Sequence, residues 1–263
     1  MRRARRSGLL LPAATLWQRE TVRFLRQRNR VAGALGTPLL FWILLGSGYG
    51  SSFQSPGGNA GYLAYFFPGS LVLTLFFTAI YSTISIIEDR REGFLQAVLV
   101  APIPRAAIIL GKVLGGATVA LIQALLFLLL APTAGIPITV ASFAATTASL
   151  ALIALGLTGL GVILAWRMES TQGFHAVMNL VLMPMWMLSG ALFPIAGAAG
   201  WMGWVMRFNP LTYGVASVRS ALGLPAPGLP APAVTLAITA VFGLLTFAAA
   251  TLLAGRRPSA VQP

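Results

Sequence analysis

The chain has 263 residues, of which 57% are hydrophobic and only 9% are charged, whereas a soluble domain carries about 25% charged residues. This composition excludes an ordinary soluble protein. The apolar runs are far longer than the strands of about 10 residues in a membrane barrel, so we expect an all-α integral membrane protein. There is no cysteine, and therefore no disulfide or thiolate chemistry.

The formal net charge of +13 is typical of proteins that bind nucleic acid, but its distribution favours a membrane protein instead. The basic residues gather at the ends of apolar runs, as the positive-inside rule expects. We therefore predict no nucleic-acid partner.

The first 30 residues are strongly basic. Arg2, Arg3, Arg5 and Arg6 precede a short apolar run, which is typical of a signal peptide, but charged residues follow the run at once, so we expect no cleavage. Residues 12–30 have the pattern of an interfacial helix, with its basic face toward anionic headgroups of membrane lipid. That helix is also a candidate surface for a cytoplasmic partner. Its two faces comprise Arg19, Arg23, Arg26 and Arg30 on one side and Trp17, Phe24 and Leu25 on the other.

Six apolar stretches are long enough to cross a bilayer, which takes about 20 residues. They cover residues 31–53, 62–87, 106–131, 139–165, 173–190 and 233–253. We therefore expect one transmembrane domain over residues 1–263, with both termini on the same side. Sixteen of the eighteen Lys and Arg residues would lie on that side, and only Arg207 and Arg219 on the other, which predicts cytoplasmic termini. The chain shows no convincing internal repeat, which argues against an inverted-repeat carrier.

The loop at residues 88–105 holds three of the five acidic residues, Glu88, Asp89 and Glu92. A charge at the bilayer centre costs about 2.5–3.5 kcal/mol, so we expect this loop to lie in water. A short amphipathic run follows, and prolines end it. We expect a surface helix that docks on a protein outside the membrane. Alternatively, its apolar face lies on the lipid headgroups, and Glu88 and Glu92 only stabilise a helix end through the helix dipole. Its apolar face comprises Phe94, Leu95, Val98 and Leu99, and the prolines are Pro102 and Pro104.

Residues 191–231 are apolar but interrupted by Gly, Pro and Trp residues. The stretch is too broken for one span. We expect short helices that re-enter the outer leaflet, with tryptophans at the interface. Asn209 and Pro210 fit a structural turn, and Arg219 fits either an anchor that reaches for the interface or a ligand for an anionic substrate.

No catalytic, metal or nucleotide site is expected on this chain. Lys112 follows Gly111, but Ala106 and Val113 stand where a phosphate-binding loop needs Gly and Ser or Thr. No expected span carries an acidic residue for a proton or sodium relay. The only histidine, His175, is too little for a metal site, and Ser189 lacks a histidine in the last span to activate it. Energy for any transport would have to come from a partner that moves the 88–105 loop.

Two segments together resemble the ABC type-2 exporter permeases, and their order and spacing agree over nearly the whole chain. The first comprises Glu88, Arg91, Glu92, Gly93, Leu95, Leu99, Pro102, Pro104, Leu110, Gly111 and Lys112. The second comprises Leu188, Ser189, Gly190, Phe193, Pro194, Trp201, Trp204, Asn209, Pro210, Leu211, Tyr213 and Arg219. One departure is Phe94, where that family often has Thr.

The resemblance implies a permease subunit of an ATP-driven exporter in the bacterial cytoplasmic membrane. Two permease chains, identical or paralogous, would pair with two ABC ATP-binding subunits, which would hold the ATP and Mg that this chain lacks. Residues 88–101 would couple to the ATPase, and the first, second and fifth spans would line a path for an amphiphile such as a drug, a lipid or a lipid-linked glycan. Phe193, Pro194, Asn209, Pro210, Tyr213 and Arg219 would form an outer gate.

Other functions stay open at this point. A membrane scaffold or assembly factor would share the six spans without transport. An ion-coupled carrier would need flux that collapses with uncouplers.

Overall fold

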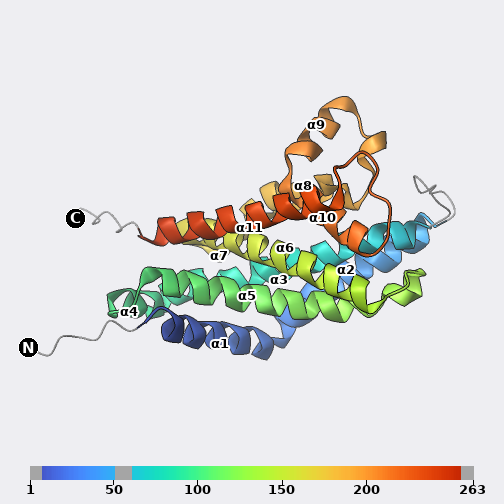
Figure 1. The fold of residues 1–263 in the computed structure, drawn as a ribbon. Helices are drawn as coiled ribbons and strands as arrows, with labels where there is room; N and C mark the ends of the chain where they lie inside the picture. The colour runs from blue at the N-terminus through green and yellow to red at the C-terminus, as the bar shows by residue number, and fades with distance from the viewer. Residues whose placement is uncertain (1–7, 51–60, 256–263) are drawn as a thin grey trace, which may run out of the picture.

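The computed structural model describes residues 8–50 and 61–255, and these form a bundle of helices that run along a common axis (Figure 1). Helix α3 lies at its centre and contacts α2, α5 and α6, while α1 packs on α5 and α11 packs on α6. The helices that build this body are α1 (Leu10–Arg26), α2 (Arg28–Gly48), α3 (Tyr62–Arg91), α5 (Arg105–Leu128), α6 (Val140–Arg167) and α11 (Pro232–Gly255).

Six helices in the described part are long and apolar enough to cross a membrane, which confirms the all-α membrane fold with six spans. Some bounds differ from the expected ones. Helix α2 begins at Arg28 rather than at residue 31, and α3 continues through Asp89 to Arg91, so two expected loop carboxylates belong to a helix. The expected end of the first span at residues 51–53, the turn at 54–60, and Arg2, Arg3, Arg5, Arg6, Arg256 and Arg257 lie outside the described residues.

Helix α3 is enclosed by its own chain. In its most apolar stretch 94% of the residues are buried, against 22% in α2 and in α11. Aromatic rings pack edge-on around it, with Trp42 of α2 5.5 Å from Phe67 and 5.7 Å from Phe127 of α5 between ring centroids. Most of α3 is thus covered by its own chain, and the expectation that the second span lines a path stays a prediction.

Helix α1 lies beside the first half of α5 and runs in the same direction (Figure 1). Two α5 glycines permit the close approach, because a Cβ atom at Gly111 would be 2.6 Å from the Leu16 Cβ and one at Gly115 would be 2.7 Å from the Glu20 Cβ. The Trp17 indole also donates a hydrogen bond to the Thr118 hydroxyl at 3.0 Å. The expected interfacial helix is thus packed along the bundle.

The fifth span is broken rather than continuous. It comprises α7 (Thr171–Val177), the π-helical turn η2 (Met178–Leu182), α8 (Met183–Trp186) and a second π-helical turn η3 (Met187–Ala191). Pro184 has no backbone N–H to donate, and Leu188 and Gly190 leave the helical region, Gly190 with a φ of +79°. Such breaks free backbone carbonyls that must find other donors inside a membrane.

Short helices complete the two ends of the bundle. We call one the α4 end, after α4 (Phe94–Val100), and the other the α9 end, after α9 (Gly200–Phe208). The α9 end also holds η1 (Ala131–Ala134), η4 (Ile195–Gly197) and α10 (Pro210–Ala221). In Figure 1 the α4 end is on the left, together with the start of α1 and the end of α11.

We predict that Gly111→Ala destabilises the protein by about 1–3 kcal/mol, because the new methyl group overlaps Leu16 and the Ala13 carbonyl oxygen, and α1 must move away. The matched control is Gly36→Ala in α2, where nothing lies within 4 Å of the added carbon. The control should be neutral or stabilising by up to about 1 kcal/mol, since alanine favours a helix. Thermal unfolding in one detergent tests both, and equal stabilisation would exclude tight α1–α5 packing.

Candidate functional site

The turn into α4 depends on Gly93, whose φ of +77° lies in the left-handed region that glycine adopts without a Cβ clash. This turn folds α4 back on α3. Leu95 is only 3% exposed, and Phe94, Val98 and Leu99 pack against the core. Leu95 is therefore used to hold α4 on its own chain. Phe94, Val98 and Leu99 are half-buried, and a docking role for this face stays a prediction.

The opposite side of α4 is open. Gln96, Ala97 and Val100 are exposed, Val100 to 84%, and the Glu92 side chain just before the helix is 63% exposed. Pro102, in the turn that leads to α5, is exposed as well. A protein that approaches the α4 end meets this polar and lightly apolar strip first.

Behind α4 lies a cluster of charged side chains from four helices, which we call the ion cluster. Asp89 of α3 is fully buried and accepts hydrogen bonds from Arg19 at 2.8 Å and Arg23 at 2.5 Å, and it also pairs with Lys112 of α5. Glu20 pairs with Lys112 at 2.8 Å and accepts a hydrogen bond from Ser85 at 2.7 Å. A buried charge needs such pairing, because desolvation costs several kcal/mol per ion.

Glu88 extends the ion cluster toward the solvent. It accepts a hydrogen bond from Arg23 at 2.8 Å and another from Arg30 of α2. Arg19 and Arg23 therefore face carboxylates of α3, which corrects the expectation that their face of α1 meets lipid headgroups. Arg26 is exposed, so contact of its side chain with lipid headgroups stays a prediction.

Arg19 connects three elements. Its guanidinium carbon lies 3.8 Å from the centre of the Phe94 ring of α4, while its nitrogens bond Asp89 of α3 and Glu20 of its own helix. Burial lowers the pKa of Arg19, but the hydrogen bond and attraction to Asp89 outweigh this and raise the pKa, so the group stays cationic. A cation held over an aromatic face is attracted to it, and α4 is thereby tied to α1 and α3.

Two further arginines tie the end of α3 to the end of α6 and to the turn that follows it. Arg90 donates to the carbonyls of Met168 at 2.9 Å and Trp166 at 2.6 Å, and Arg91 donates to the carbonyl of Glu169 at 3.1 Å. Arg91 therefore has a structural contact on its own chain, whatever it does toward a partner.

Sequence reasoning missed four members of the ion cluster as a site: Glu20, Ser85, Asp89 and Lys112. A signal for Glu20 was present. It follows Ala13 and Leu16 and precedes Phe24 at helical spacing, so it lies on the apolar face of α1, and these residues are the buried ones in the structure. A carboxylate on such a face needs a buried cation, which the lone lysine of the chain supplies.

At the α9 end, side chains from α3 and α10 bind the carbonyls freed by the broken fifth span. We call Tyr62, Tyr65, Asn209 and Arg219 the carbonyl clamp. The Asn209 amide donates to Met185 at 2.5 Å and Leu188 at 3.0 Å, and its oxygen accepts from the Leu211 N–H at the start of α10. The two tyrosine hydroxyls donate to the carbonyls of Leu192 and Gly190 at 2.9 and 3.0 Å.

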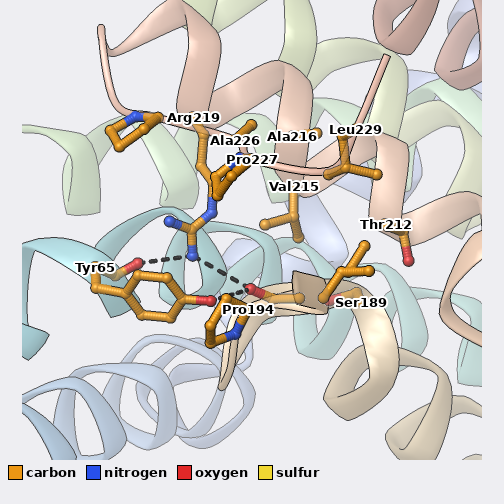
Figure 2. A pocket seen from close by; sticks show the side chains of 13 residues that line it. Tyr65, Ser189, Pro194, Thr212, Val215, Ala216, Arg219, Ala226, Pro227 and Leu229 are labelled. Atoms are coloured by element: carbon orange, nitrogen blue, oxygen red, sulfur yellow. Dashed lines mark hydrogen bonds between the residues drawn. The ribbon is translucent and has the colours of Figure 1, made fainter. Parts of the chain in front are cut away.

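Arg219 closes the carbonyl clamp. Figure 2 shows one terminal nitrogen donating to the Tyr65 carbonyl at 2.9 Å and to the Gly190 carbonyl at 3.2 Å. Its guanidinium carbon lies 4.0 Å from the centre of the Tyr65 ring, and the side chain is only 5% exposed. The expectation of an anchor that reaches for the interface is therefore wrong, because the group points into the protein.

The remaining expected gate residues lie near the carbonyl clamp. Pro194 lines a cavity beside Arg219, and Tyr213 donates a hydrogen bond to the Arg207 carbonyl at 2.7 Å. Pro210 opens α10, and Phe193 is half-buried. His175 lies edge-on to Tyr81, and the described residues hold no group of three metal-binding side chains.

Comparison with known proteins adds a family and several relatives. The ABC-2 type transporter family matches residues 13–222. A transport permease of Cyanophora paradoxa, ycf38, is 30% identical over 185 residues, which cover 69% of this chain and 64% of the relative, less than two thirds of its length.

Two nodulation proteins J are similar over more of their own length. That of Rhizobium meliloti (strain 1021) is 28% identical over 200 residues, covering 74% of this chain and 75% of the relative. That of Neorhizobium galegae is 27% identical over 237 residues, covering 85% of this chain and 86% of the relative. The matches to all three relatives thus extend over most of the six-helix body.

We predict that Asp89→Asn destabilises the protein by about 3–5 kcal/mol, because it leaves Arg19, Arg23 and Lys112 with too few buried anions. Glu92→Gln is the matched control, since the Glu92 carboxylate is 63% exposed and lies 3.9 Å from Arg23; it should cost less than about 1 kcal/mol. Unfolding by denaturant in mixed micelles measures both, and a small effect of Asp89→Asn would show that the ion cluster does not hold the α4 end together.

Proposed function

Because this chain belongs to the ABC-2 type transporter family, we propose that it is the membrane permease of an ATP-driven exporter. The observation that carries the proposal is a six-span body with a short surface helix, α4, that Arg19 ties to both α1 and α3. ATP and Mg would be bound by a separate ABC subunit. The permease itself would not be an enzyme.

We place the α4 end in the cytoplasm of a bacterial cell. Arg19, Arg23, Arg30, Arg105 and Lys112 belong to this end or to the helix starts around it. A cytoplasmic position for them agrees with the positive-inside rule. Both ends of the chain would then be cytoplasmic, and the α9 end would face outward.

The ATP-binding subunit would contact the exposed strip of α4, at Gln96, Ala97 and Val100, and the Glu92 carboxylate beside it. The buried face of α4 would carry the displacement inward, since Leu95 and Phe94 are fixed in the permease. The partner can shift the permease between two conformations only if it binds one of those conformations more tightly than the other. The ion cluster would pass the motion to α3 and α5 together.

The path for the cargo would form between two permease chains, identical or paralogous. The first and fifth spans support this, because only 22% and 39% of their most apolar stretches are buried in one chain. Both spans carry exposed apolar side chains, among them Leu40 and Leu44 in the first and Leu180 and Val181 in the fifth. Such faces suit an amphiphilic cargo, for example a drug, a lipid or a lipid-linked glycan, together with the second chain.

We predict that Val100→Glu abolishes co-purification of the ATP-binding subunit and ATP-driven transport while the melting temperature stays that of the wild type. The side chain is 84% exposed, so the charge disturbs docking and not folding. Leu95→Glu should instead unfold α4, because it buries a carboxylate in a position that is 3% exposed.

Val140→Glu is the matched control for this prediction. It places the same charge on an equally exposed valine, 89% exposed, at the start of α6 and the opposite end of the bundle. The control should keep both the ATP-binding subunit and transport. Normal coupling in Val100→Glu would exclude docking on this strip.

A further inference from the structure

Arg219 is a buried cation that pairs with no acidic side chain among the described residues. The chain has five acidic residues, and all five lie among the described residues. Four are Glu20, Glu88, Asp89 and Glu92 in or beside the ion cluster, and the fifth, Glu169, has its carbonyl bound by Arg91 of the same end. Tyr65, which Arg219 contacts, is 24 residues before Asp89 on α3, or roughly 36 Å along a helix. An identical second chain would have its acidic residues at its own α4 end, and so would bring no additional acidic residue to the α9 end.

The hydrogen bonds that Arg219 makes do not use its full capacity. A guanidinium has five N–H donors, and one terminal nitrogen serves both the Tyr65 and the Gly190 carbonyl. The Tyr65 side chain also lies within hydrogen-bond reach of the guanidinium. No other described residue accepts a hydrogen bond from its Nε or its other terminal nitrogen. Figure 2 shows the guanidinium against the Tyr65 side chain, with Ala226 and Pro227 of the following loop on its other side.

Holding carbonyls does not by itself require a charge at this position. The neutral Asn209 amide satisfies two carbonyls of the same broken segment, at 2.5 and 3.0 Å. A full charge removed from water is costly unless it is paired. The position of Arg219 is therefore better explained by an anion that it meets than by the two carbonyls alone.

The space for such an anion is present beside Arg219. A cavity with about 30 Å³ of free volume for a water-sized sphere is lined by Arg219, Ser189 and Thr212 together with Pro194, Val215 and Leu229. This volume is the space open to the centres of such spheres, and about 10–15 Å³ of it already admits one water. The cavity therefore leaves room for a small polar group such as a phosphate or a carboxylate.

We infer that the cavity beside Arg219 binds a small oxyanion, phosphate or carboxylate, held by the unused donors of the guanidinium. The anion would be a free ion or the headgroup of an amphiphile whose tail lies outside the cavity. Under the proposed export function, an amphiphile whose headgroup binds here would be the cargo, and this cavity would recognise that headgroup at the α9 end. The site itself needs no ATPase, so binding can be tested apart from transport.

The test uses the full chain in phosphatidylcholine nanodiscs, with the melting temperature followed against increasing ligand. Dodecyl phosphate, inorganic phosphate and the neutral dodecyl maltoside form the three arms. We expect saturable stabilisation by at least one phosphate ligand and none by the maltoside. Stabilisation by inorganic phosphate would identify a free ion as sufficient, and stabilisation by dodecyl phosphate alone would identify an amphiphile headgroup.

Variants assign the binding to Arg219. Arg219→Gln should raise the half-saturating concentration by about tenfold or more, because a charged hydrogen-bonded pair is lost, and Arg219→Lys should lie between. Arg207→Gln, at an exposed arginine of α9, is the matched control and should bind like the wild type. If Arg219→Gln does not fold, Ala226→Phe narrows the cavity from the loop and should block binding with the carbonyl contacts intact.

Two results would overturn the inference. One is the absence of saturable stabilisation by either phosphate ligand in the wild type. The other is stabilisation that survives unchanged in Arg219→Gln, or in Ala226→Phe where the glutamine variant does not fold.

Discussion

The enclosure of α3 by other helices of its own chain decides what the polar groups at its two ends can do. Inside a closely packed bundle, a buried carboxylate or free carbonyl has to be satisfied mainly by protein groups. At one end Asp89 is fully buried, and cations reach it from α1 and α5. At the other end the hydroxyl and carbonyl of Tyr65 meet the broken fifth span and Arg219. One helix thus joins two polar sites that are otherwise far apart.

The ion cluster connects α4 firmly to the bundle. A surface helix held only by its apolar face would lack this connection. A short helix of seven residues has little stability by itself. Leu95 inserts into the core, and the Phe94 ring lies under the Arg19 guanidinium, which is fixed in turn by Asp89. A push on the exposed strip of α4 therefore has to move α1 and α3 as well. The glycines at 111 and 115 add α5 to the same unit, because α1 packs directly on them.

Much of the fold could be predicted from the sequence, because long apolar runs and the positions of charges depend on local composition. The six spans, the short helix after Gly93 and the broken region after residue 190 follow from such local signals. The direction of the α4 face could not be predicted, since Phe94, Leu95, Val98 and Leu99 suit a partner and the chain's own core equally well. The burial of Asp89 depends on Arg19, Arg23 and Lys112, which are distant in sequence, and no periodicity shows which distant residues meet. The same holds for Arg219, whose partners Tyr65 and Gly190 come from other helices.

The break in the fifth span explains why polar side chains gather at the α9 end. A continuous helix satisfies its own carbonyls, so it would need neither Asn209 nor the hydroxyls of Tyr62 and Tyr65 beside it. Because Leu188 and Gly190 leave the helical region, carbonyls around this break bind donors from α3 and from the start of α10. These are the carbonyls of Met185, Leu188, Gly190 and Leu192. Any movement of this segment must exchange those hydrogen bonds for others, and in a membrane water or a polar ligand has to supply the replacements. Under the proposed export function, opening at this end would therefore be coupled to hydration or to the arrival of a polar headgroup, while the helix-enclosed α3 would give the segment one well-defined closed position.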